Sequence, residues 1–124
     1  MSDKKLTFEE TLTWMKTTDY SGAIGVTARF RVADEYVDEF VALLKDYSPY
    51  VLEEEGCLDY SFHRDWQNPN DFWLTEKWAS PTILLQHLGP NARKGTKYEG
   101  SIPLDKFAAM NIFPDPAAIY KVGL

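Results

Sequence analysis

The chain has 124 residues, of which 44% are hydrophobic and 26% are charged, values typical of one folded domain and not of a disordered chain. Its net charge of -6 argues against nucleic acid as a partner, because phosphate binding requires a basic surface, and gives no support to membrane binding. The single cysteine, Cys57, excludes an internal disulfide. No apolar run is long enough to span a membrane and the N-terminus lacks the apolar core of a signal peptide, so we expect a cytoplasmic protein.

The beginning of the chain reads as an arm that precedes the main domain. Residues 7–17 carry apolar side chains at helical spacing and predict a short amphipathic helix. Residues 19–22, which read Asp-Tyr-Ser-Gly, are typical of a linker. We therefore expect an N-terminal arm at 1–22 and a domain at 23–124.

The first part of the domain predicts a strand followed by a helix. Residues 24–32 alternate apolar and polar side chains, as in a strand with one buried face. Asp34 is well placed to cap the helix that follows, and residues 37–51 carry an apolar stripe at helical spacing. Pro49 predicts a kink or a split in this helix, and Gly56 marks its end. The acidic run just before Gly56 is expected to be exposed.

The most informative segment is a predicted β-hairpin at 57–78. Two alternating runs are separated by the turn-forming sequence Gln-Asn-Pro-Asn. If Arg64 lies opposite Phe72, then Glu76 lies opposite Tyr60. A carboxylate among aromatic side chains is costly to bury without a partner, so Glu76 requires one. The face that carries it consists of Leu58, Tyr60, Phe62, Arg64, Phe72, Leu74, Glu76 and Trp78.

The remainder of the chain completes an α+β pattern. Ser80 followed by proline starts a helix that contains His87. Residues 89–103 read as a loop, 104–110 as a short helix and 117–122 as the last strand. The order β-α-β-β-α-β predicts a ferredoxin-like α+β fold, an antiparallel sheet with helices on one face.

The other face of the predicted sheet is polar but contains a tryptophan. Such a face can lie against water, whereas Trp73 at its centre favours a second copy of the chain. We therefore expect a homodimer whose sheets are held in register by opposite charges. The face consists of Thr27, Arg29, Arg31, Asp59, Ser61, His63, Trp73, Thr75 and Lys77.

The inner face of the sheet is the candidate site. A contact between Glu76 and His87 would hold the imidazole in one tautomer and make it a usable general base, with Tyr60 as a hydrogen-bond donor to an oxyanion. An aromatic floor beneath the helices would suit a flat, apolar ligand. That floor consists of Phe30, Tyr60, Phe62, Phe72 and Trp78.

Structural roles for the same residues are open alternatives. An aromatic stripe on a strand is often plain core, and a Glu76–His87 pair can simply tie a helix to the sheet. Phosphate-binding loops, HExxH and the nucleophile elbow are missing from the sequence. The two histidines, His63 and His87, are predicted on opposite sides of the sheet. We therefore expect neither a metal nor a cofactor.

The order of these motifs resembles that of the antibiotic biosynthesis monooxygenase family. The resemblance covers residues 23–88, from the first strand through EEEGCLDYSFHRD and NDFWLTEKWAS to the helix that ends in QH. The matching positions are Gly56, Cys57, Leu58, Tyr60, Arg64, Asp65, Phe72, Glu76, Trp78 and His87.

The resemblance implies a dimeric α/β barrel in which two ferredoxin-like sheets meet face to face. For the members that are enzymes it implies cofactor-independent oxidation of quinols or polycyclic phenols by O2, through an anion formed by a base. His87, Glu76 and Tyr60 would then be catalytic. The substrate would lie against Trp78, Phe62, Phe30 and Phe72.

Three functions therefore follow from the sequence. The first is a cofactor-independent monooxygenase that acts on a quinol-like or polycyclic phenolic molecule. The second is a dimeric barrel without catalytic activity that binds a small aromatic or signalling molecule, since a fold alone does not establish activity. The third is an isomerase that transfers a proton in the same pocket.

Overall fold

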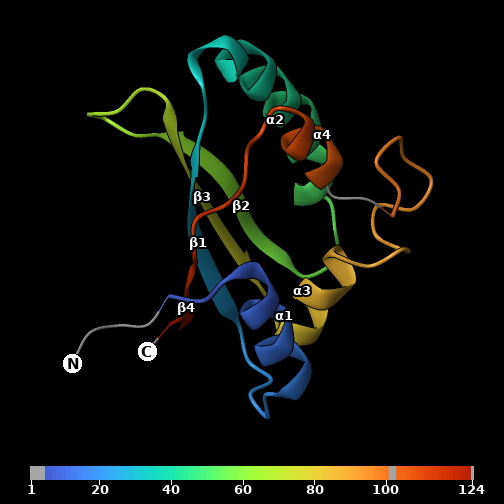
Figure 1. Cartoon of the computed structure of the whole chain (residues 1–124). Helices are drawn as coiled ribbons and strands as arrows, with labels where there is room; N and C mark the ends of the chain where they lie inside the picture. The colour runs from blue at the N-terminus through green and yellow to red at the C-terminus, as the bar shows by residue number, and fades with distance from the viewer. Residues whose placement is uncertain (1–4, 101–102, 124) are drawn as a thin grey trace.

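A computed structural model describes residues 5–100 and 103–123 and contains one four-stranded antiparallel sheet with strand order β2-β3-β1-β4. The strands are β1 (Ile24–Arg31), β2 (Cys57–Arg64), β3 (Asp71–Trp78) and β4 (Ala118–Lys121). The helices are α1 (Phe8–Thr17), α2 (Val37–Leu52), α3 (Pro81–His87) and α4 (Leu104–Ala109). Figure 1 shows all four helices on one side of the sheet, which confirms the expected ferredoxin-like α+β fold.

The core lies between the sheet and the helices, where alternation along the strands turns one set of side chains inward. Trp78, Ile24, Phe40 and Val51 are almost completely buried there. The pairing of β2 with β3 places Arg64 opposite Phe72 and Tyr60 opposite Glu76, as the sequence predicts.

The predicted hairpin face is wrong at Leu58. Cys57 pairs with Trp78 and Asp59 pairs with Lys77, so a β-bulge at Leu58 places one extra residue in β2. A bulge reverses the alternation on one side of it. Leu58 is consequently 56% exposed, whereas Cys57, which alternation placed on the outer face, packs against the core.

The structure differs from two expectations for the first long helix, the cap at Asp34 and a split at Pro49, whereas a kink at Pro49 stays a prediction. Asp34 does not cap it but begins a short 3-10 turn, η1 (Asp34–Tyr36), and its carboxylate accepts a hydrogen bond from the Asn70 side chain. Helix α2 then runs from Val37 to Leu52 without a split at Pro49. Tyr47 and Val51, on either side of the proline, are buried against the sheet. Their burial holds the helix together where the proline removes one backbone hydrogen bond.

The N-terminal arm is fastened to the rest of the molecule through Leu6 and through helix α1. Thr7 and Glu10 form a capping box at the start of α1, which satisfies two backbone donors there. Leu6 exchanges two backbone hydrogen bonds, of 2.8 and 2.7 Å, with Ala117. Helix α1 itself packs against α3. None of the helices in the described ranges is long and apolar enough to cross a membrane.

The loop at 89–100 has no regular element, as expected, but is held firmly to α2. Asp46 accepts a hydrogen bond of 2.6 Å from the Tyr98 hydroxyl. Its carboxylate also forms an ion pair of 2.8 Å with the Lys97 ammonium. The loop thus closes over the end of α2, where it carries Arg93 into the interior.

Candidate active site

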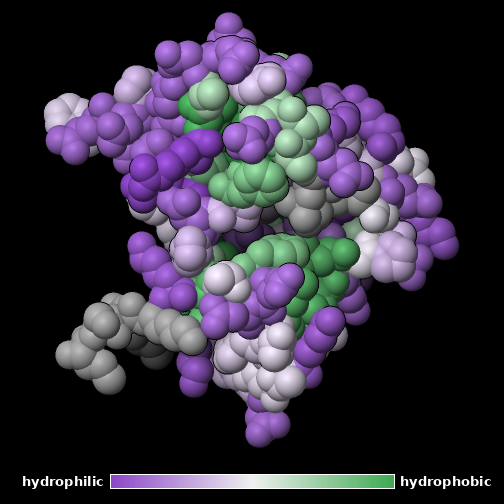
Figure 2. Space-filling view, viewed as in Figure 1, coloured by the Kyte–Doolittle hydropathy of each residue, from purple (hydrophilic) through white to green (hydrophobic). Residues whose placement is uncertain are grey.

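A largely apolar pocket of about 110 Å³ lies between the inner face of the sheet and helices α1, α3 and α4. Figure 2 shows hydrophobic surface on both sides of the hollow between the α2–α4 part of the molecule and the α1–α3 part. Strands β1, β2 and β3 supply one wall, the three helices supply others, and residues 114–117 cross one edge.

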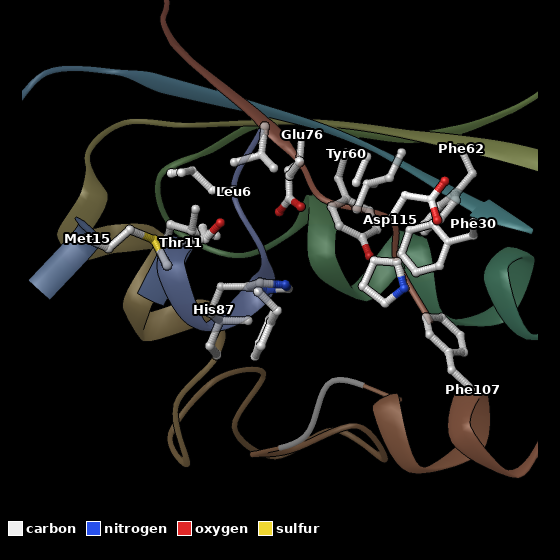
Figure 3. Close-up of a pocket in the computed structure, with 18 of the residues that line it drawn as sticks. Leu6, Thr11, Met15, Phe30, Tyr60, Phe62, Glu76, His87, Phe107 and Asp115 are labelled. Atoms are coloured by element: carbon white, nitrogen blue, oxygen red, sulfur yellow. The ribbon is translucent and has the colours of Figure 1, made fainter. Parts of the chain in front are cut away.

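The side chains divide the pocket into a polar middle and two mainly apolar ends, and the Asp115 side chain lies beside Phe30 at one of them (Figure 3). The middle carries Glu76, Tyr60 and His87. One end is formed by Leu6, Thr11 and Met15 from the N-terminal arm, and the other by Phe30, Phe62 and Phe107. Apolar walls with a few convergent polar groups are the usual composition of a small-molecule site.

Five of the seven site residues predicted from the sequence line this pocket, and two do not. Phe30, Tyr60, Phe62, Glu76 and His87 line it. Phe72 packs instead against Phe40 in the core, with ring centroids 5.1 Å apart. Trp78 is fully buried behind His87, with 4.6 Å between the ring centroids, so it supports the histidine from outside the pocket lining.

The hydrogen-bond partner of His87 is Glu54 and not the expected Glu76. His87 Nδ1 lies 2.7 Å from Glu54 Oε2, and within the described ranges no hydrogen bond joins His87 to Glu76. Glu54 reaches the histidine because the chain turns sharply after α2. That turn passes through Gly56 at φ +83°, where an added Cβ would lie 2.6 Å from Ile83 of α3.

This contact selects one tautomer of the imidazole. An ionised carboxylate can only accept hydrogen bonds, so Nδ1 must carry the proton and donate it to Glu54. The second ring nitrogen, Nε2, is then a proton acceptor. Figure 3 shows the His87 side chain extending into the pocket below Glu76. A neutral imidazole held in this way is suited to act as a general base.

Arg93 completes a buried cluster around this pair. Its Nη1 donates to Glu54 Oε2 at 3.0 Å and to the His87 carbonyl at 3.2 Å, while Nε donates to the Tyr98 carbonyl at 3.1 Å. The same Nη1 lies 3.1 Å from His87 Nδ1. Glu54 is the nearer partner of Nδ1, so the Nδ1–H donor is satisfied by the carboxylate and the guanidinium neutralises that carboxylate.

Glu76 is a buried carboxyl group in the middle of the pocket. Its Oε1 accepts a hydrogen bond of 2.8 Å from Trp78 Nε1. Burial raises the pKa of Glu76 above its usual value, and the nearby His87 and the Trp78 hydrogen bond offset part of that rise. The group can therefore hold a proton more readily than an exposed glutamate.

Tyr60 supplies a neutral hydroxyl beside these two groups. Burial, followed by the negative charge of Glu76, raises the pKa of Tyr60 well above its usual value. The hydroxyl stays protonated at neutral pH and can donate a hydrogen bond to an oxyanion. Its ring also lies 5.9 Å from the His87 ring, centroid to centroid.

Sequence reasoning missed Glu54 and Arg93, which orient the histidine. Glu54 belongs to the acidic run that was expected to be exposed, yet its side chain is only 11% exposed. Arg93 lies in a loop without periodicity. The one available signal is that a buried Arg93 side chain needs an acidic partner, and this signal does not identify which one.

We predict that Glu54→Leu changes the tautomer of His87. Without an acceptor oxygen at position 54, the Arg93 guanidinium, whose Nη1 lies 3.1 Å from Nδ1, is placed to donate to Nδ1, which moves the proton to Nε2. Long-range ¹H–¹⁵N NMR of the imidazole distinguishes the two forms. The exposed neighbour Glu55→Leu is the matched control and should leave the spectrum unchanged. An unaltered His87 spectrum in Glu54→Leu would contradict the assignment.

We also predict that Glu76→Gln alters how stability depends on pH. Because the pKa of Glu76 is raised on folding, its favourable contribution is complete below about pH 4.5 and is lost as pH rises through the raised pKa. The free energy of unfolding of Glu76→Gln minus that of the wild type should therefore grow with pH and then level off. Urea titrations from about pH 4 to 8 measure this difference.

The exposed Glu39→Gln serves as the control for this series, since Glu39 lies on the outer side of α2. The free energy of unfolding of Glu39→Gln minus that of the wild type should stay constant from about pH 4 to 8. Parallel curves for the Glu76 and Glu39 variants would show that burial of Glu76 does not perturb its titration.

Comparisons with known proteins identify the family and the fold of this chain. Residues 23–96 match the model of the antibiotic biosynthesis monooxygenase family. An uncharacterised Synechocystis protein is 32% identical over 72 residues, which cover 56% of this chain and 49% of that protein. The chain thus matches only about half the length of that relative.

Solved structures show the same fold. A conserved protein from Methanosarcina mazei is 27% identical, with a TM-score of 0.65 over 82% of this chain and 93% of that one. A Caulobacter crescentus protein that carries the family's name is 24% identical, with a TM-score of 0.67 over 85% and 93% of the two chains. Because the family model matches more than half of its residues, the chain belongs to the antibiotic biosynthesis monooxygenase family.

Proposed function

We propose that this protein is a monooxygenase that oxidises a small phenol or quinol with O2 and needs no cofactor. The observation that carries the proposal is His87, which is held by Glu54 in the tautomer that makes Nε2 a proton acceptor in an apolar pocket. Membership of the family supports the same reaction class.

The reaction begins with proton transfer in a dry site. Nε2 of His87 takes the hydroxyl proton of the substrate, and Tyr60 donates a hydrogen bond to the phenolate that forms. The electron-rich anion passes electrons to O2, and a carbon–oxygen bond forms to give a peroxide.

The same histidine then completes the reaction. The imidazolium returns its proton to the outer peroxide oxygen, and the neutral histidine then removes the hydrogen from the carbon that carries the peroxide. The O–O bond breaks as the new C=O bond forms, and the outer oxygen takes this second proton and leaves as water. A quinol and O2 give a hydroxyquinone and water, so the quinol supplies all four electrons and no other reductant is required. Glu54 stabilises the imidazolium between the two proton transfers.

The size of the pocket favours one ring over a polycyclic substrate. A cavity of roughly 150 Å³ is known to accommodate benzene, and this pocket has about 110 Å³, so a single ring with a short alkyl group requires a small displacement of the pocket walls. Three fused rings would require the helices to move apart. We therefore narrow the substrate class expected from the sequence to phenols and quinols with a single ring.

Oxygen uptake tests the proposal. Purified, metal-free protein is mixed with a panel of hydroquinones in an oxygen-electrode cell, and His87→Ala is compared with His63→Ala. Loss of a general base lowers a rate by about 100-fold or more, so we expect His87→Ala to lose nearly all uptake. His63 is exposed on the outer strand face, and its variant should retain the wild-type rate.

Two outcomes would contradict the proposal in different ways. Absence of protein-dependent uptake across the panel would favour a protein that binds an aromatic molecule without oxidising it. Uptake that survives His87→Ala, in a variant with a native circular dichroism spectrum, would exclude the histidine as the base.

We also propose that two copies of the chain pack through the bare face of the sheet. Figure 1 shows the four helices on the opposite side, and this face carries Trp73 with the Arg29 guanidinium 5.4 Å from its ring. Asp59 lies opposite Lys77 in the strand register. Such a mixture of aromatic and paired charged side chains suits a sheet-to-sheet interface.

Sedimentation equilibrium at micromolar concentration tests this assembly. We expect about twice the chain mass of 14.3 kDa. Thr75 lies at the centre of the face, opposite Thr27 on one side and Ser61 on the other, so Thr75→Arg should place an unpaired charge in the interface and give monomers. A monomeric wild type would contradict the proposal.

A further inference from the structure

The pocket extends beyond the part of the chain that matches the family. The match runs from residue 23 to residue 96. Nearly half of the residues that line the pocket lie outside this range. They come from the N-terminal arm and from the segment after the loop, and the two are joined by the Leu6–Ala117 hydrogen bonds. One apolar end of the pocket is therefore built by the arm of this chain.

The two ends of the pocket differ in chemistry. The end away from the arm is aromatic: Phe30 lies 5.6 Å from Phe62 and 5.7 Å from Phe107, centroid to centroid. Aromatic side chains arranged at tilted and edge-on angles pack well against another ring. This end suits the ring of a phenol.

The end at the arm is mainly aliphatic, and Phe8 is the one aromatic side chain that the described part of the arm contributes to the pocket. Met15 is buried and flexible enough to fit irregular chains, and Leu6 adds a branched side chain. The Thr11 hydroxyl donates to the Thr7 carbonyl of its own helix at 2.9 Å, so it offers the pocket no free hydrogen-bond donor. A carbonyl or carboxylate would lose hydrogen bonds here, whereas an alkyl group would not.

We propose that the pocket binds a single-ring phenol or quinol with a short alkyl group ortho to the reacting hydroxyl, and that the N-terminal arm is the subsite for this alkyl group. The placement follows from the order of groups in Figure 3, where Glu76, Tyr60 and His87 lie between the aromatic end and the arm. With the ring among the phenylalanines and the hydroxyl at His87, only an ortho substituent points toward Met15. The choice of a phenolic ring rests on the proposed function.

Binding of isomeric alkylphenols tests the inference without turnover. Under anaerobic conditions, isothermal titration calorimetry compares phenol with its 2-alkyl and 4-alkyl derivatives from methyl to butyl. Burial of one methylene improves affinity about fourfold. We expect this gain along the 2-alkyl series until the arm subsite is full, and no comparable gain along the 4-alkyl series.

Variants in the arm connect the preference to its residues. Met15→Ala and Leu6→Ala enlarge the subsite, so the chain length that binds most tightly in the 2-alkyl series should increase. Leu12→Ala is the matched control, because Leu12 lies on the same helix and packs against the core but does not line the pocket. It should leave the length profile unchanged.

The outcomes separate this inference from the proposed function. Equal affinity for 2-alkyl and 4-alkyl isomers, or binding of none of the series, would overturn the subsite. A length profile that both arm variants leave unchanged, with native circular dichroism spectra, would overturn the role of the arm. Tighter binding of the 2-alkyl isomers without oxygen uptake in the quinol panel would support the alkyl subsite and contradict the monooxygenase activity. Oxygen uptake without tighter binding of the 2-alkyl isomers would support the monooxygenase activity and contradict the alkyl subsite.

Discussion

The buried cluster of Glu54, His87 and Arg93 is the interaction on which the site depends. Its members come from the turn after α2, from the last position of α3 and from the 89–100 loop, so it joins three segments that no regular hydrogen-bond ladder connects. Removal of one partner from a buried ion pair costs about 3–5 kcal/mol, because the other charge is left uncompensated. The same contacts that hold these segments together also determine which nitrogen of His87 can accept a proton.

The position of His87 explains why such a cluster suits a base in an apolar pocket. His87 lines both the pocket and the polar groove outside it, where Glu54 and Arg93 lie. The pocket side of the imidazole faces mainly apolar walls, while its other side contacts Glu54 and Arg93. In the proposed reaction, Glu54 would stabilise the imidazolium from outside the pocket.

The sequence predicted the regular parts of this arrangement, and local irregularities account for its errors. Alternation placed Glu76 and Tyr60 on the same face, and the pairing of Arg64 with Phe72 across the turn placed them opposite each other. The bulge at Leu58 breaks that period and cannot be found from it. The identity of the partner of His87 depends on the turn at Gly56, which carries Glu54 inward from a run that looks solvent-exposed in sequence. The Arg93 position depends on a loop that is held by the hydrogen bond between Tyr98 and Asp46, two residues far apart along the chain.

Polar and apolar contacts in the pocket place different demands on the residues that form them. The polar middle of the pocket needs donors and acceptors at fixed distances, and its groups lie within the stretch that matches the family, at 23–96. The apolar end at the arm needs only shape, because hydrophobic burial is non-directional and scales with the area removed from water. Side chains such as Met15 and Leu6 can therefore differ in size without disturbing the Glu54–His87 hydrogen bond. Under the proposed function, an arm that is held by the Leu6–Ala117 hydrogen bonds and lies outside the polar cluster would change which molecule is accepted without altering the proton chemistry at His87.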